Sequence, residues 1–272
     1  MTTLTASGPA FLFCPADRPD RFAKAATVAD VVIIDLEDAV APSRREEARR
    51  NLLDAPLDPA TTIIRVNPVT SHDHGRDIAA AAKAGFGTIM LAKTSCADEV
   101  ESLRGFDVVA LCETPEAITA LEEIAACSNT VGLMWGSEDL VSALGGYSSR
   151  HDDGSFRDVA RFARARTLIA ARAHQLMALD TVCLDFSNLD ALRVEATDAA
   201  AMGFNGTACV HPTQVAVVRE AYMPSVAQLR WATEILDVAE GREGVFRVGG
   251  LMVDGPVLAQ ARQIVGRSRT SN

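Results

Sequence analysis

Three acidic residues end a run of branched apolar residues in the stretch VVIIDLEDAV, residues 31–40. The acids are Asp35, Glu37 and Asp38. An unbroken run of Val and Ile is typical of a buried parallel strand. Carboxylates crowded at the end of such a strand repel one another and raise each other's pKa, unless a cation lies beside them. The stretch therefore predicts a cation beside these acids, and we expect the acids to face a metal site, directly or through water.

Most of the other short apolar runs in the chain are also closed by polar residues. In chain order these are Arg65 with Asn67, Lys93, Glu113, Gly136 to Asp139, Asp185 and His211. Together they form a set of carboxylates with one Arg, one Lys and one His. A hard divalent cation relieves the repulsion within such a set, because cations such as Mg²⁺ prefer oxygen ligands.

The apolar runs that carry these residues recur at fairly even intervals. Eight of them are predicted strands, at 10–14, 31–37, 61–67, 87–93, 107–113, 130–136, 179–186 and 205–212. Stretches with helical spacing are clearest at 19–29, 43–53, 77–85, 115–126 and 156–177. Strand followed by helix, eight times over, predicts an α/β fold of the (β/α)8 TIM-barrel type. An open doubly wound sheet is the alternative, although no GxGxxG follows the first strand.

The residues after the eighth run predict an extension of the barrel. Helices are expected near 213–221, near 225–240 and from about 255, with a Gly-rich turn between the last two. We therefore expect a barrel over residues 1–221 and a C-terminal helical extension over residues 222–272.

In a barrel of this kind the chemistry takes place at the C-terminal ends of the strands. Glu113 and Asp139 follow adjacent strands and are the natural pair of Mg²⁺ ligands, since one or two carboxylates commonly hold this ion. Arg65, across the mouth, offers a planar fork for a substrate carboxylate. Each residue also has a simpler interpretation: Glu113 as a loop acid, Asp139 as a helix cap and Arg65 as a structural ion-pair partner.

Composition and charge limit the classes of partner. The chain has 272 residues, of which 48% are hydrophobic, and a net charge of -10. It has no long Lys/Arg block, which argues against nucleic acid and anionic membrane as partners. No apolar run approaches the roughly 20 residues of a membrane span, and we expect no signal peptide. Six cysteines without a CxxC pair predict reduced, mostly buried thiols in a cytoplasmic protein.

Several motifs, in this order and at these separations, resemble those of the citrate lyase beta-subunit-like (CitE-like) proteins of the HpcH/HpaI aldolase and acyl-CoA lyase superfamily. They are LFCPADRPDRFAKA, DLEDAV, IIRVN, MWGSEDL, VHPTQ and GLMVDGPVLAQA, with a Glu closing the fifth run. The resemblance covers nearly the whole chain and is greatest to the stand-alone branch of the family. It implies a (β/α)8 barrel, usually trimeric, that uses Mg²⁺ to cleave or form a carbon–carbon bond between an oxo acid and a CoA thioester.

The resemblance also implies roles for single residues. Glu113 and Asp139 match the metal ligands, Arg65 matches the clamp on the oxo-acid carboxylate, and Glu37 matches the acid beside the metal's water ligands. The backbone that would help to hold the oxo acid belongs to Gly136, Ser137 and Glu138. The segment that would receive CoA contains Pro15, Arg18, Arg21 and Lys24.

Asp254, in VDGPVL, matches the acid/base aspartate that family members carry on a C-terminal lid, often into the barrel of a neighbouring subunit. From the residues alone, Asp254 is the N-cap of the last helix. The family often has a Pro-Lys pair at the end of the fourth strand, with an acid two residues on. Here Ala92, Lys93 and Ser95 stand at these positions. The roles of Lys93 and His211 stay open.

The implied reaction is the Mg²⁺-dependent cleavage of a 3-hydroxyacyl-CoA that bears a second carboxylate, such as malyl-, citramalyl-, citryl- or hydroxymethylglutaryl-CoA. The products would be acetyl-CoA and an oxo acid such as glyoxylate, pyruvate or oxaloacetate. Asp254 would protonate the acetyl-CoA enolate, with its pKa raised by burial under the closed lid.

Three alternatives remain. One is a beta subunit that acts only within a multi-protein citrate lyase-type complex. Another is a metal-dependent aldolase on free oxo acids, in which Arg18, Arg21 and Lys24 would have no obvious role. The third is a regulatory barrel without activity.

Overall fold

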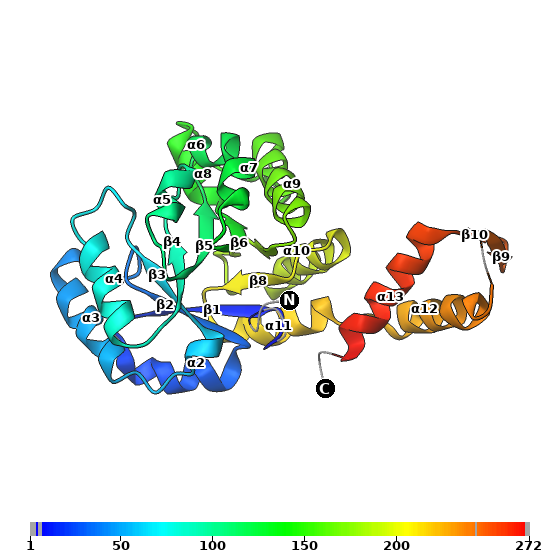
Figure 1. Cartoon of the computed structure of the whole chain (residues 1–272), viewed down its shortest axis with the longest axis horizontal. Helices are drawn as coiled ribbons and strands as arrows, with labels where there is room; N and C mark the ends of the chain where they lie inside the picture. Colours follow the sequence, from blue (N-terminus) through cyan, green and yellow to red (C-terminus); the bar gives the residue numbers. More distant parts are fainter. Residues whose placement is uncertain (1–3, 5–6, 243, 270–272) are drawn as a thin grey trace.

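The computed structural model, which describes residues 4, 7–242 and 244–269, contains eight parallel strands that close into a barrel (Figure 1). The strands are β1 Ala10–Pro15, β2 Val31–Asp35, β3 Thr62–Val66, β4 Thr88–Leu91, β5 Asp107–Cys112, β6 Thr130–Trp135, β7 Met177–Asp180 and β8 Gly206–Cys209. Each strand pairs with the next, and β1 pairs with β8 through Phe11 and Ala208. The predicted TIM barrel is confirmed.

Helices surround the barrel. They are α2 Phe22–Val28, α3 Arg45–Leu53, α4 His74–Lys83, α5 Ala97–Glu101, α6 Pro115–Thr119, α7 Leu121–Ala126, α8 Ser137–Ala143, α9 Asp158–Ala173, α10 Leu189–Met202 and α11 Pro212–Tyr222. Local sequence explains several of their starts. Thr114 caps α6, because its Oγ1 accepts the Ala117 N–H at 3.1 Å, and Pro115 occupies the first helical position. The stretch 115–126, which was expected to be one helix, forms α6 and α7.

Strand β2 shows why its sequence is an unbroken apolar run. Val31 and Ile33 belong to the cluster that fills the inside of the barrel. Val32 and Ile34 belong to the cluster between the barrel and the helices. Both faces of the strand are therefore buried, which explains the apolar residues at positions 31–34.

The seventh strand was predicted at 179–186 with Asp185 at its end, and this prediction is wrong. Strand β7 ends at Asp180, whereas Asp185 is exposed in the loop before α10. The apolar residues that suggested a longer strand serve another purpose, because Val182 and Leu184 line a cavity at the barrel mouth. The loop is therefore apolar without being a strand.

The C-terminal extension forms an arm that projects from the barrel (Figure 1). It consists of α12 Val226–Ala239, β9 Phe246–Val248, β10 Leu251–Val253 and α13 Gly255–Arg269. The arm has an apolar cluster of its own, centred on Ala232, Ile235, Val253 and Ala261. Within the described residues, no helix has both the length and the apolar character needed to cross a bilayer.

The Gly-rich turn predicted in this extension is in fact a short β-hairpin. Leu251 pairs with Val248, so the turn consists of Gly249 and Gly250, with φ values of 52° and 88°. Two positive φ values are what a tight two-residue hairpin turn requires, and glycine adopts them without strain.

Candidate active site

A cavity of about 280 Å³ opens where the barrel strands end. Its polar wall includes Asp35, Arg65, Glu113, Ser137, Glu138, Asp139 and Thr181. Its apolar wall includes Phe13, Leu111, Met134, Val182, Leu184 and Val210. A concave, largely apolar space with a few converging charged groups is the usual form of a small-molecule site. The predicted metal ligands and substrate-binding residues therefore line this cavity, whereas Glu37 and Asp254 are not among its lining residues.

Strand register places Asp35 beside Arg65. The two residues are partners in the pairing of β2 with β3. Asp35 accepts hydrogen bonds from Arg65 Nε at 2.7 Å and from Nη2 at 2.5 Å. It also accepts the backbone N–H groups of Glu37 at 2.9 Å and Ala39 at 3.0 Å. Asp35 is thus a fully engaged structural acid that fixes the plane of the guanidinium.

Arg65 therefore presents only part of its fork to the cavity. Its Nη1 lies 3.3 Å from Glu37 Oε2, and the guanidinium carbon lies 4.8 Å from the centre of the Phe13 ring. A guanidinium has five N–H groups, and Asp35 takes two of them. The other three remain for Glu37 and for a ligand carboxylate.

The Glu37 carboxylate lies between two cations, Arg65 and Lys93. Its carboxylate is ion-paired with Lys93 Nζ, which also lies 3.2 Å from Asp38 Oδ2 and 3.7 Å from Asp139 Oδ1. The acids of VVIIDLEDAV were expected to face a metal site, whereas in the structure Asp35, Glu37 and Asp38 are paired with the basic side chains of Arg65 and Lys93. Sequence alone did not show that Lys93 would reach so many acids.

Glu113 and Asp139 lie together at the mouth, as strand order predicted. The Glu113 side chain is buried and its Oε1 accepts the Lys93 backbone N–H at 3.1 Å. Burial and the nearby Asp139 raise the pKa of Glu113 to about 8. A Cβ at position 136 would lie 2.6 Å from Glu113 Oε2, so only glycine at position 136 leaves room for this carboxylate.

The donor set at Glu113 and Asp139 fits Mg²⁺. Among the described residues, no group of three or more His, Cys, Asp or Glu side chains is arranged to hold a metal. A cation here would rest on two carboxylates and take its other ligands from substrate and water, which is how Mg²⁺ usually binds. It would also relieve the repulsion that raises the Glu113 pKa. The residues therefore fit this ion better than a metal that needs a complete protein cage.

The stretch after β6 forms the start of α8. Gly136 precedes the helix, and the Ser137 N–H points to Thr181 Oγ1 at 3.4 Å. Glu138 Oε1 accepts from Ser137 Oγ at 3.0 Å and from Ser149 Oγ at 2.6 Å. The Glu138 carboxylate is therefore held by serines, while the Gly136–Ser137 backbone borders the cavity.

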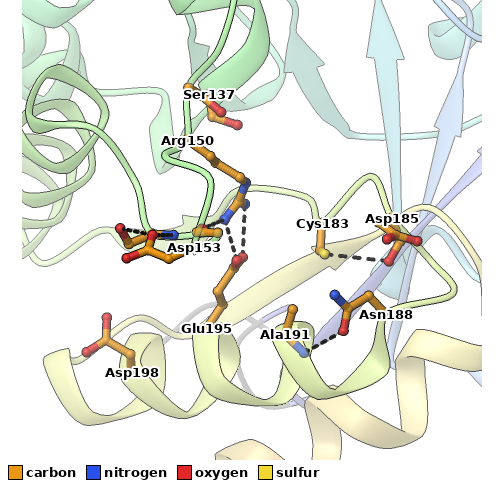
Figure 2. A network of polar contacts seen from close by, with 12 residues as sticks. Ser137, Arg150, Asp153, Cys183, Asp185, Asn188, Ala191, Glu195 and Asp198 are labelled. Atoms are coloured by element: carbon orange, nitrogen blue, oxygen red, sulfur yellow. Dashed lines mark hydrogen bonds and ion pairs between the residues drawn. The ribbon is translucent and has the colours of Figure 1, made fainter.

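The loop that carries Ser149 is attached to α10. Figure 2 shows Arg150 reaching Glu195 on that helix, with Nη2 3.1 Å from Oε2. The same view shows Asp185 and Asn188 in the loop before α10, where Asn188 caps the helix by accepting the Ala191 N–H at 3.1 Å. Asp185 thus belongs to a loop turn and not to the group of acids at the mouth.

Buried polar groups behind the mouth were missed by the sequence analysis. Asp180, the true end of β7, is bound by Arg164 Nη2 at 2.7 Å and by Trp135 Nε1 at 2.6 Å. Asn67, predicted at a strand end, does not line the cavity. Its Nδ2 donates to Leu36 O at 2.9 Å and to Asp77 Oδ2 at 2.7 Å. These hydrogen bonds join residues that are distant in the chain, and no local sequence pattern predicts them.

The predicted CoA segment lies at the end of β1 and on the elements that follow. Pro15 ends the strand, and Arg21 ends a short 3₁₀ helix, Pro19–Arg21. Arg18 is paired with Asp20 at 2.9 Å, whereas Arg21 and Lys24 are exposed. The segment thus offers basic groups on the surface beside the mouth.

His211 and Asp254 act as helix caps in the structure. His211 Nδ1 accepts the Thr213 N–H at 3.3 Å at the start of α11, and its ring stacks on Phe186 with centroids 5.0 Å apart. Asp254 Oδ1 accepts the Val257 N–H at 3.3 Å. Asp254 joins β10 to α13, and these elements meet at the outer end of the arm, away from the barrel (Figure 1). The chain does not bring Asp254 to its own mouth.

The chain is similar to known proteins along nearly its whole length. The family model described as HpcH/HpaI aldolase/citrate lyase matches residues 10–212. A citrate lyase subunit beta-like protein of Mycobacterium tuberculosis (strain H37Rv) is 49% identical, covering 97% of this chain and 97% of its own length. The mitochondrial citramalyl-CoA lyase of Rattus norvegicus is 30% identical, covering 94% of this chain and 84% of its own. The crystal structure of CitE from Mycobacterium tuberculosis in complex with magnesium, acetoacetate and coenzyme A matches with a TM-score of 0.95 and 49% identity, covering 98% of this chain and 100% of that one.

Proposed function

The chain belongs to the HpcH/HpaI aldolase/citrate lyase family, and from that premise we propose that it is a Mg²⁺-dependent carbon–carbon lyase. Its substrate is a 3-hydroxyacyl-CoA with a second carboxylate, and its products are acetyl-CoA and an oxo acid. The observation that carries this proposal is the buried Glu113 beside Asp139 at a mouth that also holds Arg65. Relatives named as a citramalyl-CoA lyase, and a similar structure with magnesium and coenzyme A, support it.

Arg65 positions the substrate. Its N–H groups that are bound neither to Asp35 nor to Glu37 hold the carboxylate next to the reacting carbon. Glu113 and Asp139 would hold Mg²⁺, which when bound stabilises negative charge on the substrate oxygen. The backbone at Gly136 and Ser137 closes the other side of the oxo-acid site.

Bond cleavage moves two protons and one electron pair. A base at the mouth takes the proton of the substrate hydroxyl, whose oxygen becomes the carbonyl oxygen of the oxo acid. The bond between the second and third carbons of the acyl chain breaks, and its electron pair becomes the enolate of acetyl-CoA. Asp254 then donates a proton to the enolate carbon. Glu37, held between Arg65 and Lys93, is assigned to orienting water at the mouth.

Asp254 would act in a neighbouring subunit. Since β10 and the start of α13 lie at the outer end of the arm, away from the chain's own mouth, a second copy is the natural recipient. We therefore propose a homo-oligomer, as in the trimers implied by the family resemblance. Residues 1–221 would supply the barrel and residues 222–272 the lid. Pro15, Arg18, Arg21 and Lys24 would receive the CoA thioester.

We also propose that the protein resides in a reducing compartment such as the cytoplasm. All six cysteines are free thiols, and five of them are buried. Free buried thiols are usual in cytosolic proteins, where disulfides are rare.

A turnover assay tests the function. The purified protein is incubated with malyl-, citramalyl-, citryl- and hydroxymethylglutaryl-CoA, first with Mg²⁺ and then with EDTA, and acetyl-CoA is measured by chromatography. We expect release from at least one thioester with Mg²⁺ and none with EDTA. Absence of release from all four, in a folded protein that binds Mg²⁺, would contradict a stand-alone lyase and favour a subunit that needs partners or an aldolase on free oxo acids.

A further inference from the structure

Lys93, two residues after the end of β4, has an unusual backbone conformation. Its φ is 52°, and the other described non-glycine residue with positive φ is Gln175. A long side chain in this region costs on the order of 1 kcal/mol, and glycine would adopt the conformation without strain. A lysine at such a position is therefore explained by what its side chain does.

Both ends of Lys93 contact acids of the mouth. Its backbone N–H donates to Glu113 Oε1 at 3.1 Å. Its ammonium is ion-paired with Glu37 and lies 3.7 Å from Asp139 Oδ1. In this conformation the N–H reaches Glu113, which follows β5, and the side chain reaches Glu37, which follows β2, and Asp139 on α8.

Lys93 is also the cation that Asp139 faces. Among the ion pairs of the described residues, Lys93 is the one that involves Asp139. Arg65, the other cation of the mouth, is engaged with Asp35 and Glu37. The charge next to Asp139 therefore depends on a single ammonium.

We propose that Lys93 is a positioning residue whose ammonium holds Glu37 in place and restrains cation binding at Glu113 and Asp139. The inference rests on the proposed function for its catalytic consequence. The proposal predicts two effects, on cation affinity and on turnover, that a lysine with only a structural role would not produce together. Loss of the ammonium removes a positive charge near the cation site, so a divalent cation binds more tightly. The same loss frees Glu37, so turnover falls.

Three substitutions test the proposal. Lys93→Met removes the charge but keeps the length, Lys93→Gly also removes the backbone strain while keeping the N–H, and Lys93→Arg keeps the charge. Lys83→Met is the matched control, because Lys83 is an exposed lysine in the last turn of α4. Mn²⁺ serves as the probe. Its affinity for each free protein is measured by electron paramagnetic resonance, alongside kcat, KM and the thermal midpoint.

We expect Lys93→Met and Lys93→Gly to bind Mn²⁺ roughly three- to tenfold more tightly than the unsubstituted protein. We expect kcat to fall at least about tenfold in both, with a smaller change in KM. Lys93→Gly should be no less heat-stable than the unsubstituted protein. Lys93→Arg should keep Mn²⁺ affinity within about twofold, and Lys83→Met should change nothing.

Unchanged or weaker Mn²⁺ binding in Lys93→Met would overturn the proposal. A kcat defect in Lys93→Met that Lys93→Gly lacks would also overturn it, since loss of the ammonium, which the two variants share, would then not be the cause. The Mn²⁺ titration needs no substrate. It therefore still decides the matter if the unsubstituted protein proves inactive on every thioester, an outcome that would count against the proposed function alone.

Discussion

Arg65 donates hydrogen bonds to both carboxylate oxygens of Asp35, from Nε at 2.7 Å and from Nη2 at 2.5 Å. The pair is nearly buried, since the side chains are 13% and 1% exposed. The acid that ends β2 therefore orients the guanidinium that is to hold the substrate. Asp35 and Glu37 thus hold the guanidinium of Arg65 in place at the wall of the cavity.

Asp35→Asn should lower both stability and activity. The amide cannot accept both hydrogen bonds of the guanidinium, and Arg65 is left as a partly unpaired buried charge. Breaking a buried pair costs about 3–5 kcal/mol. Urea unfolding and steady-state kinetics check this, and we expect KM to rise as Arg65 loses its orientation. Asp158→Asn, in the exposed pair with Arg161, is the control and should leave both measurements unchanged. Normal kinetics in Asp35→Asn would show that Arg65 needs no such support.

Glu113→Gln should abolish the response of the protein to divalent cations. A ligand present at 100 times its dissociation constant stabilises the folded state by about 2.7 kcal/mol. For a chain of this length we expect saturating Mg²⁺ to raise the thermal midpoint by about 5 °C. Differential scanning calorimetry should show this shift for the unsubstituted protein and not for Glu113→Gln or Asp139→Asn. Glu122→Gln, on the exposed side of α7, should retain it. A shift of equal size in Glu113→Gln would place the cation elsewhere.

The pH dependence of stability should report the buried carboxyl of Glu113. Its pKa is raised from 4.5 to about 8, chiefly by burial and then by Asp139. The folded protein therefore keeps a proton that the unfolded chain loses above pH 4.5, so this contribution to stability declines as the pH rises toward 8. The decline reaches up to about 5 kcal/mol over the whole interval. The Glu113→Gln variant lacks this pH-dependent contribution to stability.

Chemical denaturation of the metal-free protein at several pH values between 5 and 8 measures this effect. We expect the free energy of unfolding of Glu113→Gln to increase, relative to that of the unsubstituted protein, as the pH rises. A difference that stays constant across this range would mean that Glu113 ionises normally in the folded state.

Mixing experiments should reveal which barrel Asp254 serves. Asp254→Asn chains have an intact mouth, and Glu113→Gln chains have an intact arm. If each arm completes a neighbouring barrel, co-expression of the two inactive variants should restore part of the lyase activity. Each variant expressed alone is the control. Mixed oligomers that form but stay inactive would show that the arm acts on its own barrel.

The barrel and the core of its mouth could be predicted because their signals are local. Runs such as VVII mark strands buried on both faces, and strand order alone puts Glu113 next to Asp139. The misplacement of the seventh strand has a physical cause, since Val182 and Leu184 are apolar in order to line the cavity and not to continue a strand.

What could not be predicted depends on contacts between distant residues or on backbone shape. The bond of Asp180 to Arg164 and the bond of Asn67 to Leu36 O join separate elements. The positive φ of Lys93 is invisible in a residue type that usually avoids it. Asp254 was singled out by family resemblance, because as an isolated residue it is a helix cap like many others.

The pairing of β1 with β8 has a consequence for how the protein is made. The edge of β1 that faces β8 has no partner until Cys209 has left the ribosome. At roughly 5–20 residues per second, that edge waits on the order of 10 to 40 s after it emerges. An unpaired strand edge is a template for aggregation during this interval. The nascent chain therefore carries an unpaired strand edge until its last barrel strand is translated. We expect slower translation near β8 to reduce the yield of folded protein without changing its final stability.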